Sequence, residues 1–370
     1  MRNELLYQVA LNMLPGVGSI LAKQLVSYCG SVEAIFKSTK GKLTKTPGIG
    51  PKTVEKITSS DLLTSAEEEI NRCEKAGVEI IFFTEKDYPY RLRQAIDCPI
   101  LIYAKGAASL EADKIVAIVG TRKATNYGKS VTEQIISELV PFKPVIVSGL
   151  AYGVDIMAHK SALDSGLETF GVLGSGLDII YPSTHRDTAR KMLEQGALIT
   201  EFPLGTKPDA FNFPARNRII AGMVDAVIVV EAAEKGGALI TAEIANSYDR
   251  EVFAVPGNLD ATYSKGCNKI IQQQKARIFT SVDDFAKEMN WDETGVNNIP
   301  KKPLDLNSFS EQERIIVDLL IESKNGIQID QLAWKSQLTV NQLASILLSL
   351  EFNGIIKSLP GKKYALKSRF

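Results

Sequence analysis

The stretch IVAIVGTR, residues 115–122, decides the fold of this chain. It begins with a short run of apolar residues, most of them β-branched, and the run passes at once into Gly120, Thr121 and Arg122. An apolar run of this length is typical of a strand that is buried on both faces of a parallel sheet. The stretch therefore predicts an inner strand over residues 115–119 that ends in a glycine-bearing turn.

The same pattern recurs on both sides of this stretch. Apolar runs of strand length alternate with longer helical patterns, which is the rhythm of an α/β fold with a parallel sheet. The predicted strands cover residues 78–83, 100–103, 115–119, 145–147, 169–173, 197–200, 226–230 and 251–255. We therefore predict an α/β chain whose core, residues 76–290, is a Rossmann-like parallel sheet.

The N-terminal region, residues 1–75, carries a different pattern. LPGVGSILA at residues 14–22 and TPGIGPKTV at residues 46–54 are two copies of a Gly-x-Gly turn between apolar helical runs. This is a helix-hairpin-helix signature, in which glycines let backbone N–H groups come close to a phosphate. The copies predict one helical (helix-hairpin-helix/SAM-like) module, whose turns either contact DNA or serve only to pack helices.

The chain beyond the core predicts a linker and a small third domain. Residues 291–308 are polar, contain prolines and have no apolar period, which is typical of a linker. Residues 309–370 then show three amphipathic helical patterns and a hairpin, which together predict a winged helix. The predicted elements are helices at 310–323, with Ser310 and Glu313 as a capping box, at 329–335 and at 340–352, and a hairpin that turns at 360–361.

The predicted hairpin and tail are basic. Their cations are Lys357, Lys362, Lys363, Lys367 and Arg369, and no acidic residue follows Glu351. Such a segment suits a wing that faces phosphate, but it is also common as a solubilising tail. In either case Lys363 is expected at a hairpin tip in open water.

Composition restricts the classes of function. The chain of 370 residues has 43 Lys and Arg against 43 Asp and Glu, so its net charge gives no global attraction for a polyanion. Its two ends are basic and its middle is acidic, so any nucleic-acid contact in the middle must come from a local pocket. The four cysteines lack metal-ligand or disulfide spacing, and we expect no metal and no cofactor. No apolar stretch reads as a signal peptide or membrane span, so a cytoplasmic protein with no membrane partner is predicted.

Four of the predicted strands run directly into glycine-bearing turns. The turn residues are Gly120, Thr121 and Arg122; Ser148 and Gly149; Gly174, Ser175 and Gly176; and Gly236 and Gly237. Because the carboxyl ends of parallel strands share one edge, these turns should converge on a single crevice. Backbone N–H groups and helix N-termini in such a crevice favour an anion, and phosphate is the natural candidate.

The stretch from Lys207 to Arg218 adds cations and aromatic rings. Phe211 and Phe213 precede Arg216, Asn217 and Arg218 at the start of a predicted helix, and Lys207 lies on the loop before them. Cations beside stacking surfaces are typical of proteins that bind single-stranded nucleic acid. The alternative is a structural arginine pair that bonds strand-end carbonyls and carboxylates.

Other nucleotide and catalytic patterns fail on inspection. Gly174-Ser-Gly176 lacks the third glycine of a dinucleotide site, because Ile179 stands there, and Lys123 stands where a P-loop would need its first glycine. His159 and His185 are the only histidines, and the sequence pairs neither of them with a Ser or Cys nucleophile. We therefore predict no catalytic residue.

Five motifs in order make the chain recognisable. They are IVGTRKATNYG at 118–128, SGLAYGVD at 148–155, GVLGSGLDIIYP at 171–182, FPARNRIIAG at 213–222 and VFAVPG at 252–257. The series resembles that of the DNA-processing protein A (DprA/Smf) family, closely over residues 87–279 and more loosely in the flanking domains.

The resemblance implies a single-stranded-DNA-binding protein that is not an enzyme. It implies a recombination mediator of natural transformation that loads the RecA recombinase and acts as a homodimer. By motif, Gly120, Thr121 and Arg122 would hold a phosphate, Gly174–Gly176 would add N–H donors, and Lys207 with Arg216–Arg218 would line the path of the strand. Two departures matter: Gly236-Gly237-Ala238 lacks the hydroxyls of relatives that read Ser-Gly-Ser, and Ser183 stands where some relatives have lysine.

Two other functions remain open. The Rossmann superfamily includes phosphoribohydrolases that release a base from a nucleoside monophosphate, and their motif reads Pro-Gly-Gly-x-Gly-Thr-x-x-Glu. Here Gly237 and Glu243 keep the six-residue spacing, but the middle glycine is lost and Thr241 is displaced. The third possibility is an interaction scaffold with a vestigial pocket.

Overall fold

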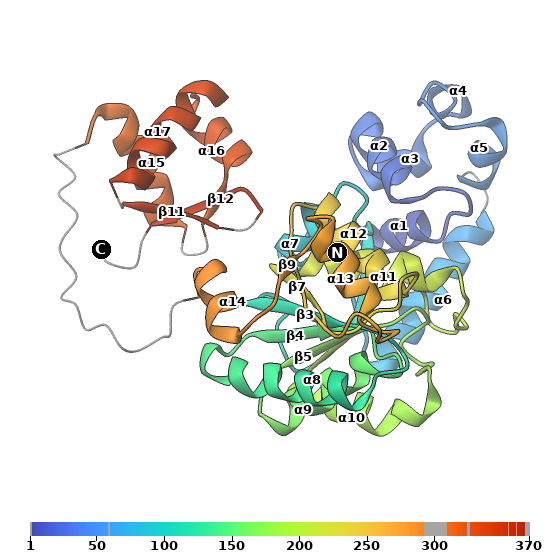
Figure 1. The fold of residues 1–370 in the computed structure, drawn as a ribbon. Helices are drawn as coiled ribbons and strands as arrows, with labels where there is room; N and C mark the ends of the chain where they lie inside the picture. Colours follow the sequence, from blue (N-terminus) through green and yellow to red (C-terminus); the bar gives the residue numbers. More distant parts are fainter. Residues whose placement is uncertain are drawn as a thin grey trace.

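The fold is described by a computed structural model that covers residues 2–57, 60–291, 309–323, 326–353, 355–359 and 361–366. Figure 1 shows a helical module at the N-terminal end, a central sheet with helices on both faces, and a small C-terminal lobe. The central sheet bears the glycine turns, so its order decides which turns can meet.

A nine-stranded sheet in the order β1-β2-β6-β5-β4-β3-β7-β8-β9 forms the centre. β3 (Ile115–Val119) lies between β4 and β7 and is parallel to both, with Val116 opposite Ile146 and Ala226. Every residue of β3 is buried, as expected of an inner strand. The other strands are β1 (Glu79–Phe82), β2 (Leu101–Gly106), β4 (Val145–Ser148), β5 (Thr169–Val172), β6 (Gly196–Thr200), β7 (Ala226–Val229), β8 (Glu251–Ala254) and β9 (Arg277–Ile278).

The edge formed by β1 and β2 adds two antiparallel strands to the predicted parallel sheet. β1 pairs with β2 and β2 pairs with β6 in antiparallel fashion, whereas the strands from β6 to β9 are parallel. Parallel neighbours need a long crossover connection, usually a helix. The chain has only the short α7 (Tyr90–Arg93) between β1 and β2, so these strands join the sheet without such a crossover.

Helices cover both faces of the sheet because the strand residues alternate in direction. Val116 and Ile118 belong to one hydrophobic cluster with α8 (Asn126–Leu139) and α9 (Val154–Asp164). Ala117 and Val119 belong to another with α11 and α12. The remaining helices of this part are α10 (Arg186–Gln195), α11 (Asn212–Met223), α12 (Gly237–Ser247), α13 (Lys265–Gln272), α14 (Val282–Glu288) and the 3-10 turns η1 (Val140–Phe142) and η2 (Ser183–His185). Figure 1 shows α8, α9 and α10 below the sheet and α11, α12 and α13 above it.

The core ends one residue later than the predicted boundary. Trp291, expected as the first linker residue, is 6% exposed, and its ring lies 5.2 Å from that of Phe285 in an edge-on contact. The rest of the predicted linker, 292–308, lies outside the described residues.

The N-terminal module, predicted over residues 1–75, shares its core with the sheet. One hydrophobic cluster joins Ile70 and Cys73 of α6 (Ser60–Ala76) to Phe82 of β1 and Tyr103 of β2. The other helices of the module are α1 (Arg2–Asn12), α2 (Ser19–Cys29), α3 (Val32–Lys37), α4 (Lys40–Leu43) and α5 (Pro51–Ile57). Sequence period locates such helices but does not reveal which neighbour covers their apolar face.

The C-terminal lobe has the predicted winged-helix elements and one more strand. Its helices are α15 (Glu311–Glu322), α16 (Ile329–Ser336) and α17 (Val340–Phe352), and the capping box of Ser310 and Glu313 is present. Its strands β10 (Ile327–Gln328), β11 (Ile356–Leu359) and β12 (Lys363–Leu366) form a sheet in the order β10-β12-β11. β10 was not predicted, because two residues are too few to show a period.

The wing contacts the core, which corrects the placement of Lys363 in open water. Lys363 is 7% exposed, and its ammonium lies 4.4 Å from the ring centre of Tyr90. Burial, together with the nearby positive charge of Arg91, lowers the pKa of Lys363 to about 8. Lys362 lies 3.3 Å from Asp249 of the core.

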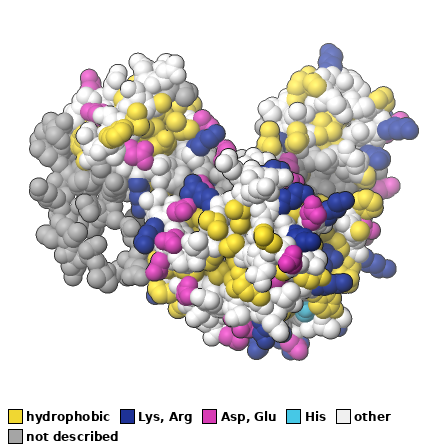
Figure 2. Space-filling view, viewed as in Figure 1, with side chains coloured by type: hydrophobic (Ala, Val, Ile, Leu, Met, Phe, Trp, Pro, Cys, Tyr) yellow, Lys and Arg dark blue, Asp and Glu magenta, His cyan; other side chains and the backbone are white. Residues whose placement is uncertain are grey.

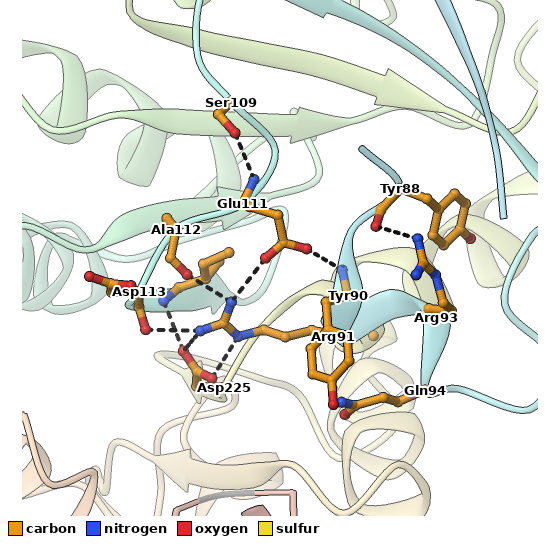
Figure 3. Close-up of polar contacts among 12 residues, drawn as sticks. Tyr88, Tyr90, Arg91, Arg93, Gln94, Ser109, Glu111, Ala112, Asp113 and Asp225 are labelled. Carbon is orange, nitrogen blue, oxygen red and sulfur yellow. Dashed lines mark hydrogen bonds and ion pairs between the residues drawn. The ribbon is translucent and has the colours of Figure 1, made fainter. Parts of the chain in front are cut away.

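The core surface under the wing is held by a polar network around Arg91, which Figure 3 shows. Arg91 Nε donates to Asp225 at 2.7 Å, and its terminal nitrogens donate to the carbonyls of Ala112 and Asp113 at 2.8 and 2.9 Å. Glu111 accepts from the backbone N–H of Tyr90. The ring under Lys363 is therefore held on a rigid base.

In the described part of the chain, each helix is too short or too polar to cross a membrane.

Candidate nucleic-acid interface

A pocket of about 530 Å³ opens at the carboxyl edge of the sheet. Its wall includes Gly120 and Arg122 after β3, Phe213 and Arg216 of α11, and Gly237 and Thr241 of α12. The chain leaves β3 and β7 toward opposite faces of the sheet, so this is the switch point at which open α/β sheets bind ligands. A smaller niche adjoins it and shares Arg122, Phe213 and Arg216. The predicted convergence of the glycine turns is confirmed at this edge.

The turn after β3 is held by the end of β7. Thr121 donates its backbone N–H to the carbonyl of Glu231 at 2.7 Å. The Glu231 carboxylate in turn accepts from the backbone N–H and the hydroxyl of Thr125, which caps α8. These bonds hold the loop that carries Arg122, while the Arg122 side chain itself is exposed.

Glycine is required at two places where the turns meet. Gly153 has φ +78°, a conformation that favours glycine, and a Cβ there would collide with the carbonyl of Thr121. A Cβ on Gly149 would occupy the place of the Arg216 guanidinium. Gly149 thus makes room for the Arg216 side chain, and Gly153 allows close approach to the backbone of Thr121.

Arg216 is a buried cation in the pocket wall. It is 4% exposed, and its Nη1 donates to the carbonyl of Val172 at 3.0 Å. Its Nε is buried with no hydrogen-bond partner among the described residues. Burial lowers the pKa of Arg216 to about 10, against the opposing effect of the Asp155 charge. A buried guanidinium with an unused donor suits an anionic ligand.

Asp155 partly neutralises this cation. It lines the same pocket and is 7% exposed. Burial raises the pKa of its carboxyl, while the charge of Arg216 and hydrogen bonds from Ala151 and Ser148 act in the opposite direction. The pocket therefore holds a buried carboxylate and a buried guanidinium together.

Aromatic side chains stand beside the exposed cation. The Arg122 guanidinium lies 5.2 Å from the ring centre of Phe213, and the Tyr181 ring lies 6.1 Å from that of Phe213. Tyr152 and Tyr181 both line the niche and are 49% and 51% exposed. The sequence analysis missed these two tyrosines as site residues, although Tyr152 lies in the motif at 148–155 and Tyr181 in the motif at 171–182.

The first turn of α12 closes the pocket on one side. Gly236 is its N-cap and Gly237 its first residue, and a Cβ on Gly237 would meet only open space. The first N–H groups of a helix have no carbonyl partner within the helix, and the helix dipole gives this end a partial positive charge. The α12 terminus therefore offers donors to the same pocket as the arginines.

The structure brings most of the predicted site residues to the pocket or its niche. Those that line one or the other are Gly120, Thr121, Arg122, Gly149, Gly174, Ser175, Phe213, Arg216, Asn217, Gly236 and Gly237. The Ser175 hydroxyl is nevertheless used internally, since it donates to the carbonyl of Ile179 at 2.7 Å.

Five predicted residues lie elsewhere. Ser148 is fully buried and donates to the carbonyl of Ile118 at 2.7 Å, and the N–H of Gly176 bonds the carbonyl of Thr206 at 2.9 Å. Arg218 pairs with Glu201 and donates to the carbonyl of Asp97. This is the structural role that the alternative interpretation gave to the arginines.

The last two of these five, Lys207 and Phe211, are on the surface. Lys207 is exposed and Phe211 is 88% exposed, and neither lines the pocket or the niche. They could contact a nucleic-acid strand only where that strand leaves the pocket.

The residues of the hydrolase alternative do not gather in the pocket. Thr241 is in the wall, but Glu243 is on the outside of α12, where its carboxylate lies 3.2 Å from the ammonium of Lys275. Among the residues that the structure describes, no group of His, Cys, Asp and Glu could hold a metal ion.

Both histidines are buried and packed. His159 Nδ1 lies 2.7 Å from the Thr169 hydroxyl, and burial lowers the pKa of His159 to about 3. His185 Nδ1 bonds the carbonyl of Leu150 at 2.9 Å.

Comparison with protein families gives matches over nearly the whole chain. The family described as "DNA recombination-mediator protein A" matches residues 79–290. A SAM-like helix-hairpin-helix tandem matches residues 9–60, and the DprA winged helix domain matches residues 300–362.

Individual relatives belong to the same family as these matches. Protein Smf of Synechocystis is 30% identical over 98% of both chains, and DNA processing protein DprA of Bacillus subtilis is 41% identical over 56% of this chain and 71% of its own. The crystal structure of DNA processing protein A from Streptococcus pneumoniae superposes with a TM-score of 0.68 at 31% identity, covering 76% of this chain and 97% of that one.

A second solved structure has a ligand in its description. It concerns the single-stranded DNA binding mode of DNA processing protein A from Helicobacter pylori. It superposes with a TM-score of 0.53 at 29% identity over 58% of this chain and 95% of that one.

Proposed function

Because this chain belongs to the DNA-processing protein A (DprA/Smf) family, we propose that it binds single-stranded DNA in the pocket at the carboxyl edge of the sheet. The observation that carries the proposal is the shared place of Arg122 and Arg216. One guanidinium is exposed against an aromatic ring, and the other is buried with an unused donor.

The phosphates and the bases of a single strand both have partners in this arrangement. Arg216 and the N–H groups of the first turn of α12 bind one phosphate, where the low dielectric of a buried site strengthens a charge-assisted bond. Arg122 contacts the next phosphate from the rim. Phe213, Tyr181 and Tyr152 supply ring faces on which bases stack without regard to their sequence.

The pocket favours a single strand over a duplex. Base faces must be uncovered to stack on Phe213 and Tyr181, and in a duplex they are covered by their neighbours. Arg216 is also buried in the pocket wall, so a duplex would meet the rim before its phosphates reach this side chain.

The finer role that we propose follows from the family. The chain acts in the cytoplasm as a recombination mediator in DNA uptake, as a homodimer that loads RecA recombinase onto single strands, and has no catalytic step of its own. The description of the matching family as a recombination mediator supports this proposal. The place of Glu243, paired with Lys275 outside the pocket, leaves the hydrolase alternative without its glutamate.

Competition binding tests the proposal. A labelled oligothymidine is bound to the full chain, and unlabelled single-stranded or duplex DNA of equal length is added as competitor. We expect the single strand to compete at much lower concentration, and equal competition would contradict the assignment. RecA-dependent ATP hydrolysis on DNA coated with single-strand-binding protein tests the mediator role separately: it should accelerate when the chain is added.

A further inference from the structure

The helix that would read DNA in this winged helix carries no cation. In helix-turn-helix folds the second helix of the pair enters the major groove, and here that helix is α17. Its exposed described residues are Asn341, Gln342, Ala344, Ser345, Leu348, Ser349 and Phe352. None of them is charged, so α17 offers nothing to neutralise phosphate.

The wing is occupied by the chain itself. Lys363 is buried over Tyr90, and Lys362 pairs with Asp249. Around them the Tyr90 hydroxyl bonds Gln331 at 3.2 Å, and the Asn290 amide bonds the carbonyl of Ser358 at 3.4 Å. A winged helix usually turns its recognition helix and its wing to DNA. Here the exposed side of the recognition helix, α17, has no cation, and the wing is covered by the core.

An apolar stripe runs along the outward side of α17. Ala344, Leu348 and Phe352 recur every four residues and so form one stripe on the helix. Leu348 is 57% exposed and Phe352 is 85% exposed, while Trp334 on the adjoining α16 is 80% exposed. The hydrophobic side chains that Figure 2 shows on the C-terminal lobe gather over this helical part. Apolar exposure of this density on so small a domain marks a docking surface.

Acidic residues outnumber basic ones on the three helices of the domain, and Glu313 accepts from the Ser349 hydroxyl, next to Leu348, at 3.4 Å. The carboxylates among the described side chains of α15 to α17 are Glu311, Glu313, Asp318, Asp330 and Glu351, and the cations are Arg314 and Lys335. Arg314 is itself 3.9 Å from Asp318, which leaves the helical side of the domain with a negative balance. An acidic surface repels nucleic acid and attracts a basic partner.

We propose that the helical face of the winged-helix domain, centred on Leu348 and Phe352, docks an amphipathic segment of another protein whose apolar side chains are flanked by Lys and Arg. The apolar stripe supplies the buried contact, as in the binding of amphipathic helices in hydrophobic grooves. The acidic residues select the charge and orientation of the segment. This role does not depend on the single-strand pocket.

Two peptides provide the probe: a labelled amphipathic helix of Leu and Lys, and its counterpart of Leu and Glu. We expect the Leu/Lys peptide to bind the full chain in the micromolar range and the Leu/Glu peptide to bind at least tenfold more weakly. Phe352→Asp and Leu348→Asp should each weaken the Leu/Lys complex at least tenfold. Ile96→Asp, at a 78% exposed position of the core, is the matched control and should leave it unchanged.

The variants also distinguish other occupants. Since Phe352 is on the surface, Phe352→Asp should melt like the wild type and keep its affinity for oligothymidine, so a failure of the pocket proposal would be seen separately. Equal peptide binding by Phe352→Asp and wild type, or no binding of the Leu/Lys peptide, would overturn the inference. So would a loss of oligothymidine affinity in Phe352→Asp, which would assign the face to nucleic acid. Loss of dimers on sedimentation of this variant would assign it to a second copy of the chain.

Discussion

Arg216 and Asp155 place opposite charges in the wall of one pocket, where burial makes each charge costly. A fully buried charge is retained in proteins when it is paired or when a ligand uses it. Arg216 keeps an Nε with no partner among the described residues, so part of its donor set remains for a ligand. We interpret the pair as a site prepared for phosphate. In the absence of phosphate, the negative charge of Asp155 partly compensates the positive charge of Arg216.

Replacement of Asp155 should therefore move stability and affinity in opposite directions. Asp155→Asn removes the negative charge that opposes the burial of the Arg216 cation, which should lower the free energy of unfolding by less than the roughly 3 kcal/mol lost with a buried ion pair in direct contact. The same change removes a negative charge near the incoming phosphate, so affinity for oligothymidine should rise. Thermal melts and anisotropy titrations measure the two effects.

The matched control for this substitution is on the same helix. Asp164→Asn, at an exposed position of α9, should change neither quantity. A melting temperature of Asp155→Asn equal to that of the wild type would show that the two charges are not coupled.

Tyr181 should contribute to binding through its ring. Tyr181→Ala removes a stacking face and should weaken oligothymidine binding by about 1–3 kcal/mol, the usual range for one stacked base. Tyr28→Ala is the control, because Tyr28 is equally exposed, at 46%, but belongs to α2 of the N-terminal module. If both variants bind like the wild type, bases do not stack in the niche.

The arginines of α11 show what a motif can and cannot predict. Arg216 and Arg218 are two positions apart, and at 3.6 residues per turn they point to nearly opposite sides of the helix. One therefore lies in the pocket, and the other bonds Glu201 and Asp97. The motif indicated that cations were present here, but only the orientation of α11 against the sheet distinguishes their roles.

At the scale of elements, apolar runs predicted the strands well. All eight predicted strands exist, because strands buried on both faces leave an unbroken apolar signal. The antiparallel direction of β1 and β2 was not predicted, since pairing depends on contacts with β6 that no local pattern shows. The predicted exposure of Lys363 was wrong for the same reason. A lysine on a hairpin gives no sign that Tyr90, far away in the chain, will cover it.

The contact between the wing and the core should depend on pH. Tyr90, Arg91, Glu111, Asp225 and Arg250 surround Lys363, and its pKa falls from the ordinary 10.5 to about 8. The native state therefore binds fewer protons than the unfolded chain between these values, so the contribution of Lys363 to stability rises as pH increases from about 8 toward 10.5.

A difference measurement isolates this effect. Lys363→Met lacks the titrating group, so its melting temperature relative to the wild type should fall as pH rises from 8 to 10. Lys362→Met is the control: its side chain is 70% exposed, and the difference from wild type should stay nearly constant. If the difference in melting temperature between Lys363→Met and the wild type also stays constant, the Lys363 ammonium is not buried between the wing and the core.

At the scale of the whole molecule, the three parts of the chain differ in their independence. α6 shares a hydrophobic cluster with β1 and β2, and the buried Glu69 accepts from the backbone N–H of Leu204 at 2.7 Å. The winged helix has a hydrophobic cluster of its own and meets the core through polar contacts. The N-terminal module is thus part of the core unit, whereas the winged helix is a separate one.

Two truncations test this division. A chain that ends at Trp291 should melt cooperatively and bind oligothymidine, because it keeps both the pocket and the Trp291 contact with Phe285. A chain that lacks residues 1–75 should lose cooperative melting, because it uncovers the apolar side of β1 and β2. Cooperative melting of this second truncated chain at the temperature of the full chain would contradict the shared core.

The place of the DNA site is tested most directly by salt dependence. For single strands, the logarithm of the binding constant falls with the logarithm of salt concentration by about 0.7 for each phosphate neutralised, so roughly three contacts give a slope near −2. Arg122→Ala should reduce this slope by about 0.7 and cost about 1.5–3 kcal/mol of affinity, because it removes a charge-assisted bond at the pocket. Lys123→Ala, the exposed neighbour outside the pocket, should keep the wild-type slope. If Arg122→Ala and Lys123→Ala give the same slope and affinity as the wild type, the strand binds elsewhere on the molecule.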